Sequence, residues 1–566
     1  MSQLQEFEDT PWPDWAEYSV YQPLVAVNLT AEYNQGVIQY VPGLAQSWNV
    51  SSNGSTYTFN LRSGVTFSNG DAFNAYQVWA MMYGDYYLSA NNSNWMEGYT
   101  IFNMTSVDFG PATLALLSQP GNLASPSPQA LAVMDNASWP IYVTGPDTIV
   151  FQLSAPFQWF LGLVVTQAGL VYDVNYVLQN GGYGTPNSVS LAFNTSPIPG
   201  TGPYVFTSVS ENAYAEFAQN THYWGDSLSA SAVASNPALD PGHVKNIIIQ
   251  YKADDVVRYS DLSTGAAQIA AIETSDWNLI TASPNQFGYI VLPSESGLLA
   301  ALSLNTQLYP TNNTDFRLAI AHAINYTQIY QQVFVGEMSP WVGPEYPAWS
   351  NFYDLGGAQP YQYNVTLAEQ YLNESHIHPS TVTLTYPVEN TCAFCVTRAE
   401  LIQNDLGAIG ISVDIEIMSS SSWCNNLCGS YSTNLADPSN LGNLNDVYGS
   451  VYAPGALTPA DTWMSLVSNE SVTGNQAIYY NPIVQSCVDA FTTASSASEV
   501  QSLCTAAQAQ IQSDAPYVWL GVAKLWYGGG SEAWSKSVVS GFYSDPTWTG
   551  YDTEPILNTI TLASGS

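Results

Sequence analysis

Residues 44–79 read LAQSWNVSSNGSTYTFNLRSGVTFSNGDAFNAYQVW and predict two strands, two turns and the start of a helix. The pair Asn53-Gly54 supplies the positive φ angles that a tight reversal needs, so we expect a hairpin around it. Apolar and polar residues alternate over residues 57–62, which is typical of a strand with one buried face. Asp71 or Asn74 is expected to cap the helix that follows.

The pattern PGLAxSWxVSxxGxTYTFxLRxGVxFxxG, read from Pro42 to Gly70, resembles the N-terminal segment of family 5 extracellular solute-binding proteins. These are the oligopeptide, dipeptide, nickel and oligosaccharide receptors of ABC importers. Further matches follow in the family's order: GTGPY at 200–204, NTHYWG at 220–225, LNT with FRLAI and AIN over 304–325, a helix and strand over 364–386, and LIQNDLGAIGISVDIEI at 401–417. The resemblance therefore covers nearly the whole chain.

The resemblance implies an α/β, two-lobed periplasmic-binding-protein-like fold with three domains and a hinge. The sequence pattern predicts strands that alternate with helices, which agrees with mixed α/β sheets. One of these helices is predicted over 316–335. The chain is expected to cross between lobes near residues 297–305 and 516–526, with the ligand between lobes that close over it. The expected limits are 1–58, 197–295 and 508–566 for the discontinuous domain I, 59–196 for the small domain II, and 296–507 for domain III, the opposing lobe.

The chain is acidic because it lacks basic residues. It has 45 Asp and Glu but only 8 Lys and Arg among 566 residues, and its formal net charge is -37. So few cations cannot neutralise the phosphates of a nucleic acid, which excludes nucleic acid as a partner. A surface of neutral polar residues suits strong acid, where carboxylates with pKa values near ~4 lose their charge. We therefore expect an extracellular protein of an acidophilic archaeon, although an acidic protein working at neutral pH has the same composition.

The sequence contains no run of about 20 apolar residues that would span a membrane, and its N-terminus lacks the regions of a signal peptide. Taken alone, this indicates a cytoplasmic protein. The resemblance instead implies an exported protein at the cell surface, whose signal and membrane anchor have been removed. Sequons permit glycosylation of an exported chain. Their asparagines are Asn28, Asn49, Asn53, Asn91, Asn103, Asn136, Asn194, Asn312, Asn325, Asn364, Asn373 and Asn469.

The six cysteines are Cys392, Cys395, Cys424, Cys428, Cys487 and Cys504. An even number in an exported chain favours disulfides. The last two fall on neighbouring helical patterns, so we predict that they pair. The first four, spaced as CxxC and CxxxC, are expected to form disulfides too. Zinc is the alternative, because four thiolates can complete a tetrahedral site, but thiols stay protonated in strong acid and release the metal.

Motifs of catalysis are missing from the sequence. HExxH, a Walker A loop and GxSxG do not occur, and His376 and His378 have no third ligand nearby. A glycosidase needs two carboxylates at a fixed separation, which a sequence cannot reveal. We therefore expect no enzymatic activity and no cofactor.

Aromatic residues are the positive signal for binding, with 17 Trp and 38 Tyr. Flat rings with a few polar groups suit clefts that recognise sugars or extended peptides. Carried over from the resemblance, the candidate ligand-binding residues are Asn305, Tyr386, Asn390, Tyr452 and Trp519. The alternatives are a turn cap for the first and core packing for the aromatic residues.

Peptide receptors of this family hold the ligand's α-amine with an acidic residue four positions before a proline, matched here by Pro459. Gly455 occupies that position, which puts α-amine capture in doubt and slightly favours a neutral oligosaccharide over a peptide. We expect a monomer that delivers its ligand to an ABC permease and its ATPase subunits. The alternatives are a surface-layer or filament subunit built on the same fold and an extracellular glycosidase.

Overall fold

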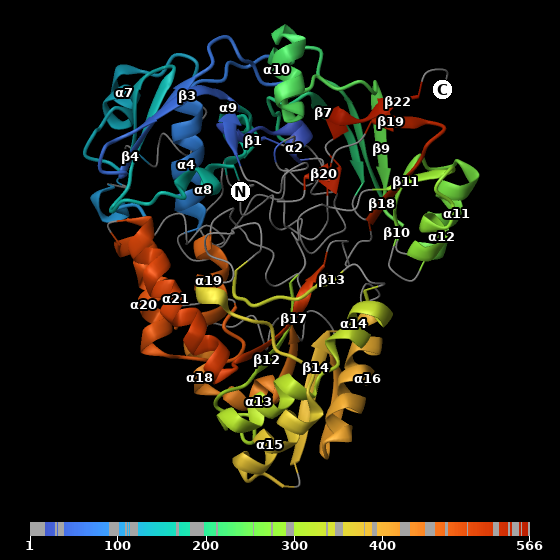
Figure 1. Cartoon of the computed structure of the whole chain (residues 1–566). Helices are drawn as coiled ribbons and strands as arrows, with labels where there is room; N and C mark the ends of the chain where they lie inside the picture. The colour runs from blue at the N-terminus through green and yellow to red at the C-terminus, as the bar shows by residue number, and fades with distance from the viewer. Residues whose placement is uncertain are drawn as a thin grey trace.

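The chain folds into two lobes, which lie one above the other in Figure 1. One lobe contains both ends of the described chain, from α2 (Glu17–Val20) to β11 (Phe287–Tyr289) and from β18 (Ser531–Ser535) onward. The other contains the intervening elements, from β12 (Leu299–Leu304) to β17 (Tyr517–Ala523). We call them the terminal lobe and the central lobe.

The computed structural model describes part of the 566-residue chain. The described residues are 17–28, 31, 39–89, 101–107, 110, 113, 123–165, 169–181, 197–210, 213–252, 254–272, 276–289, 299–334, 338–345, 355–378, 380–387, 393–418, 431–447, 459–469, 474–494, 496–523, 531–541, 544–545, 554–555 and 557–563.

The predicted hairpin lies in the terminal lobe. β3 (Ala45–Val50) pairs antiparallel with β4 (Thr56–Leu61), and Gly54 in the turn has a φ of 71°. β4 also pairs with β6 (Thr148–Gln152), and β6 pairs with β5 (Ile141–Gly145), so the sheet order is β3-β4-β6-β5. The alternation along β4 is confirmed, because every second residue of this strand is buried.

A helix covers this sheet, as the sequence predicts. α4 (Ala75–Ser89) begins after Asn74, whose Oδ1 accepts hydrogen bonds from the N–H groups of Tyr76 and Gln77 at 3.0 Å. Asn74 is therefore the cap, and Asp71 is not. Trp79 on α4 is fully buried and donates its indole N–H to the backbone oxygen of Ile141 on β5 at 3.2 Å.

Among the described residues, the terminal lobe also contains two three-stranded sheets and three two-stranded sheets, β1-β2, β19-β22 and β20-β21. β7 (Tyr204–Ser210), β8 (Tyr214–Gln219) and β9 (Asn246–Gln250) form one antiparallel sheet. In the other three-stranded sheet, β18 pairs between β10 (Ile269–Ile272) and β11, although the whole central lobe separates β11 from β18 in sequence. The smaller elements are β1 (Val25–Val27), β2 (Tyr40–Pro42), α7 (Pro128–Met134), α8 (Phe160–Val164), α9 (Val174–Gln179), α10 (Ala230–Ser235), α11 (Asp255–Thr264), α12 (Trp277–Thr281), β19 (Val539–Gly541), β20 (Ser544–Asp545), β21 (Glu554–Pro555) and β22 (Thr561–Leu562).

The central lobe is built on one mixed sheet of order β13-β17-β12-β16-β14-β15. Its remaining strands are β13 (Met338–Ser339), β14 (Ser380–Pro387), β15 (Ile411–Met418) and β16 (Leu444–Val447). Helices pack around this sheet (Figure 1). They are α13 (Thr314–Ala323), α14 (Tyr326–Gln332), α15 (Val365–Ser375), α16 (Ala393–Ala408), α18 (Tyr431–Ala436), α19 (Pro459–Val467), α20 (Pro482–Thr493) and α21 (Ala497–Asp514).

The single helix predicted over 316–335 is wrong. The chain leaves helical geometry at Ile324, whose φ and ψ are -76° and 127°, and α14 begins after Asn325. The Oδ1 of Asn325 accepts a hydrogen bond from the N–H of Gln328 at 3.2 Å, so this residue caps a new helix. The three-domain limits stay a prediction. The expected boundary after residue 58 lies within β4, and that after 507 lies within α21.

Candidate interlobe ligand site

The strands of the central-lobe sheet have one set of ends that is closest to the terminal lobe. We call this row of strand ends the cleft edge. β14, β15 and β16 run parallel, so their carboxyl ends lie at the same edge. β12 is antiparallel to β16 and β17, so the start of β12 and the end of β17 lie there too. The chain enters the central lobe at this edge and leaves it there (Figure 1). Ligands of α/β sheets bind beyond the carboxyl ends of parallel strands, so the cleft edge is the candidate site.

Three predicted ligand residues lie at the end of strands that finish at the cleft edge or after them in the chain. Tyr386 is the last residue but one of β14, and the structure describes its backbone only. Asn390 comes after β14 along the chain and Tyr452 after β16, and both lie outside the described residues. Their roles stay predictions.

Asn305 lies at the opposite edge, because it follows the end of β12. Its side chain is fully buried, and its amide donates to the backbone oxygens of Pro438 at 2.8 Å and Gly442 at 3.0 Å. Its Oδ1 accepts from the N–H of Gln307 at 3.0 Å. These bonds hold two loops together, as expected for a turn-capping residue, and they use both donors of the amide.

Trp519 belongs to the core of the central lobe. It pairs with Ala301 in the middle of the sheet, and its side chain is 1% exposed. Its ring stacks on Tyr517 with a centroid distance of 5.0 Å and meets Trp341 edge-on at 4.6 Å. A Cβ added to Gly343 would lie 2.6 Å from this ring. The indole N–H has no acceptor among the described residues, and the role of Trp519 in ligand binding stays a prediction.

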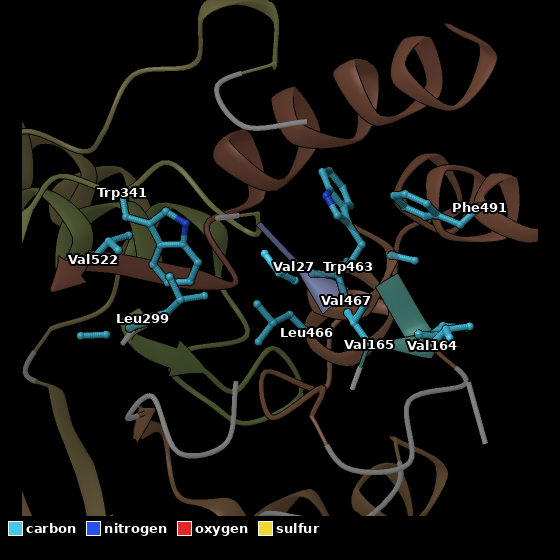
Figure 2. Packing of buried hydrophobic residues seen from close by; sticks show 14 of the residues in the cluster. Val27, Val164, Val165, Leu299, Trp341, Trp463, Leu466, Val467, Phe491 and Val522 are labelled. Atoms are coloured by element: carbon cyan, nitrogen blue, oxygen red, sulfur yellow. The ribbon is translucent and has the colours of Figure 1, made fainter. Parts of the chain in front are cut away.

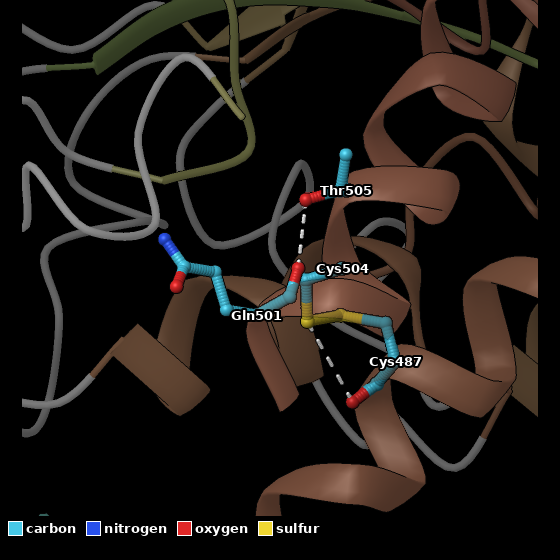
Figure 3. Close-up of a disulfide and its surroundings, with 4 residues drawn as sticks. All are labelled: Cys487, Gln501, Cys504 and Thr505. Atoms are coloured by element: carbon cyan, nitrogen blue, oxygen red, sulfur yellow. Dashed lines mark hydrogen bonds between the residues drawn. A yellow bond between two sulfur atoms is a disulfide. The ribbon is translucent and has the colours of Figure 1, made fainter. Parts of the chain in front are cut away.

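The cysteine prediction is confirmed for one pair. Cys487 on α20 and Cys504 on α21 form a disulfide, and Thr505, next to Cys504, donates its hydroxyl to the backbone oxygen of Gln501 at 2.8 Å (Figure 3). Cys395 lies on α16 without a described side chain, and the remaining three cysteines lie outside the described residues. Their pairing stays a prediction.

Metal binding finds no support in the part of the chain that the structure describes. No group of three or more His, Cys, Asp or Glu is gathered there. His376 ends α15 in a left-handed conformation with a φ of 58°, and His378 is exposed. The sequon asparagines within the described residues are exposed or half-buried, and their glycosylation stays a prediction.

Three of the rare cations are bound by backbone oxygens, whereas Lys252 and Arg258 pair with the carboxylates of Asp261 and Asp255. The buried guanidinium of Arg317 donates to the backbone oxygen of Asp514 at 2.9 Å, and its burial lowers its pKa. Arg62 donates to the backbone oxygen of Gly43 at 2.7 Å, and Lys536 also donates to a backbone oxygen, at 2.7 Å. A carbonyl oxygen does not titrate, so these contacts persist when carboxylates become protonated.

The terminal lobe contains a fully buried carboxyl group, that of Asp173, which caps α9. Burial raises the pKa of Asp173 from 3.8 to about 6; the hydrogen bond from Asn69 opposes this change, and the nearby carboxylate of Asp71 adds to it. The side chain accepts hydrogen bonds from Asn69 Nδ2 at 2.7 Å and Gln77 Nε2 at 3.1 Å. This group therefore binds its proton more readily in the folded chain than in the unfolded one.

Sequence reasoning missed a direct contact between the lobes. Trp159, just before α8, meets Phe491 of α20 with a centroid distance of 5.2 Å and an interplanar angle of 60°. Figure 2 shows Val164 and Val165 of the terminal lobe beside Val467 of α19. Trp159 and Phe491 are far apart in sequence, so no local pattern reveals their contact.

Comparisons with known proteins give relatives and structures of the same fold. The chain is 27% identical over 398 residues to di/tripeptide-binding protein 2 of Pseudomonas aeruginosa, covering 69% of this chain and 65% of the relative, which is less than two thirds of its length. A crystal structure of NikA from Brucella suis in complex with Fe(III)-EDTA has a TM-score of 0.71 at 19% identity, covering 98% of this chain and 96% of that one. DppA from Helicobacter pylori, in complex with the peptide STSA, has a TM-score of 0.65 at 21% identity, covering 97% and 93%.

The family follows from a wider match. Residues 39–459, well over half of the chain, match the model of the bacterial extracellular solute-binding proteins, family 5. This match includes the hairpin, the GTGPY and NTHYWG segments, and β12, β14, β15 and β16 of the cleft edge. The α/β fold of two lobes agrees with the structures named above. The chain therefore belongs to the bacterial extracellular solute-binding proteins of family 5.

Proposed function

We propose that the chain is the exported substrate-binding component of an ABC importer. It holds a ligand between its lobes and delivers it to the permease. The cleft edge carries this proposal, because three parallel strands end there, beside both strands that connect the lobes. A ligand bound at this edge would contact the segments that move when the lobes close. Family membership supports a binding protein of transport and not an enzyme.

A short peptide is the first candidate ligand. A relative in Pseudomonas aeruginosa is named a di/tripeptide-binding protein, and the similar Helicobacter pylori structure holds a peptide. A peptide in an extended conformation has backbone donors and acceptors along its length, so the neutral polar groups of this chain can bind it without cations.

An oligosaccharide is the second candidate, and one observation favours it. Gly455 stands where peptide receptors of the family carry the acid that binds the ligand's α-amine. The chain is also poor in charge, at 9% charged residues, and rich in aromatic residues, at 13%. A sugar needs flat rings and neutral hydrogen-bonding groups, and it keeps its hydrogen bonds in acid.

The working environment is proposed to be acidic and outside the cell. The cations bound to backbone oxygens and the raised pKa of Asp173 both support stability at low pH. Within the described residues, no helix combines the length and hydrophobicity that crossing a bilayer requires.

The test is a thermal-shift screen near pH 4 with two panels of ligands. One panel holds di- to hexapeptides, and the other holds cello- and malto-oligosaccharides. A ligand at 100 times its Kd adds about 2.7 kcal/mol to the free energy of unfolding. Stabilisation by one panel identifies the ligand class. If neither panel stabilises the chain, the transport proposal loses its support and the structural alternatives gain it.

Two alternatives from the sequence have their own readouts. A surface-layer or filament subunit would form ordered assemblies, which light scattering and electron microscopy detect at increasing protein concentration. A glycosidase would release reducing sugars from the oligosaccharide panel. A monomer that binds a panel member without turnover contradicts both alternatives.

A further inference from the structure

A second region joins the lobes, apart from the two connecting strands. On one side of Figure 2 lie Leu299 and Val522 of the connecting strands, and on the other lies a group of residues that belongs to the same hydrophobic cluster. This group combines α8 and β1 of the terminal lobe with α19 and α20 of the central lobe (Figures 1 and 2). We call it the interlobe latch. Its members are Val27, Trp159, Val164, Val165, Trp463, Leu466, Val467 and Phe491.

The interlobe latch is apolar and excludes water. Val165 of the terminal lobe is 2% exposed, and Val467 and Phe491 of the central lobe are 1% and 2% exposed. Separation of the lobes would expose these side chains to water, which opposes opening. The ring contact between Trp159 and Phe491 adds a specific geometry to this burial.

In the central-lobe half of the interlobe latch, Phe491 lies on a helix that a disulfide joins to its neighbour. Cys487 lies one turn before Phe491 on α20, and its disulfide to Cys504 joins α20 to α21 (Figure 3). Both cysteines are fully buried. The surface that receives Trp159 is therefore held in place independently of the terminal lobe.

The terminal-lobe half of the interlobe latch is carried by a short helix beside a cavity. α8 has five residues, and an apolar cavity lies behind it. The cavity is lined by residues of α8 such as Leu163 and Val164 and by residues of α4 such as Val78 and Met82. An unfilled space beside a short helix lowers the cost of moving that helix.

We propose that the interlobe latch sets the balance between the open and closed arrangements of the lobes, and thereby regulates access to the cleft edge. The effect on the ligand rests on the proposed function, whereas the effect on closure does not. A ligand then has to supply only part of the free energy of closure, because the latch contributes the rest.

The experiment measures closure without ligand, by small-angle X-ray scattering of the full chain. The main variant is Trp159→Ala, because this side chain is only half-buried and contacts Phe491 of the other lobe. The control is Trp48→Ala, which removes another half-buried tryptophan of the terminal lobe from β3. We expect a larger radius of gyration for Trp159→Ala and the wild-type value for Trp48→Ala.

A second pair of variants guards against effects on folding. Val467→Ala truncates the interlobe latch by two methyl groups, and Val484→Ala makes the same change at a fully buried position on α20. Circular dichroism checks that each variant is folded. Equal radii for wild type, Trp159→Ala and Val467→Ala would overturn the proposal, as would a wild-type chain that is already as open as the variants.

The two proposals fail in different ways. If Trp159→Ala opens the lobes but the chain binds neither ligand panel, the proposal for the interlobe latch is supported and the transport proposal is rejected. If the chain binds a panel member but Trp159→Ala does not open the lobes, the transport proposal is supported and the proposal for the interlobe latch is rejected.

Discussion

The carboxyl group of Asp173 makes the stability of the terminal lobe depend on pH in an unusual direction. Its pKa is about 6 in the folded chain and 3.8 when exposed. This difference corresponds to about 3 kcal/mol, at roughly 1.36 kcal/mol for each pH unit. Because the folded pKa is the higher one, the folded chain binds the proton more tightly. The free energy of unfolding should therefore rise as the pH falls from about 6 to 3.8, and the ionised group should cost about 3 kcal/mol at higher pH.

Replacement of Asp173 by Asn removes this titration. The amide keeps one oxygen for Gln77 but turns an NH₂ group toward Asn69. This mispairing adds a fixed destabilisation, which is separate from the loss of the titration. The pH slope is thus the quantity to compare. Urea unfolding followed by circular dichroism between pH 4 and 7 should give a wild-type curve that gains roughly 2 kcal/mol more than the Asp173→Asn curve toward low pH, because the unfolded group is already partly protonated at pH 4. Asp414→Asn, an exposed carboxylate on β15, is the control. Parallel curves for wild type and Asp173→Asn would refute the reasoning.

Three further predictions concern groups of the central lobe. Arg317→Met leaves the backbone oxygen of Asp514 without its donor, so urea unfolding should show a loss of roughly 2–4 kcal/mol, equal at pH 4 and 7; a loss confined to neutral pH would instead implicate a carboxylate. Asn305→Ala should lower the free energy of unfolding by roughly 1–3 kcal/mol and leave calorimetric affinity for a ligand from the screen unchanged, whereas weaker binding would restore Asn305 to the ligand site. Replacement of Cys487 and Cys504 by Ala opens a loop with a sequence separation of 17 and should cost about 3 kcal/mol in chemical unfolding; an unchanged midpoint would mean that the disulfide does not constrain the unfolded chain.

Local chemistry accounts for the features that the sequence predicted correctly. The Asn53-Gly54 turn and the cap at Asn74 depend on a few neighbouring residues, so their structure can be inferred from those residues alone. The pairing of Cys487 with Cys504 was predictable for the same reason, because their helices follow each other in sequence. The break at Asn325 was missed because the apolar pattern continues across it while its side chain caps a second helix.

The candidate site depended on contacts that a sequence does not contain. Asn305 was placed near the ligand by resemblance, but its amide is bound to backbone oxygens of residues 438 and 442, which only the folded chain brings close. The contact of Trp159 with Phe491 is likewise set by the way the lobes pack. The order of strands at the cleft edge could not be deduced either, because β12 pairs with strands that are distant in sequence.

The neighbouring positions of β12 and β17 have a consequence for how the chain is made. Leu299 pairs with Val522, so the central lobe is a continuous insertion whose two ends lie side by side. During synthesis it is complete before β18 exists, and it can fold as a unit. The sheet of the terminal lobe that needs β18 between β10 and β11 has to wait. Until then β10 and β11 have unpaired edges, which are prone to aggregation. The terminal lobe is therefore the first to be synthesised and the last to complete its folding. During synthesis, β10 and β11 are the strands where the chain most needs protection by chaperones.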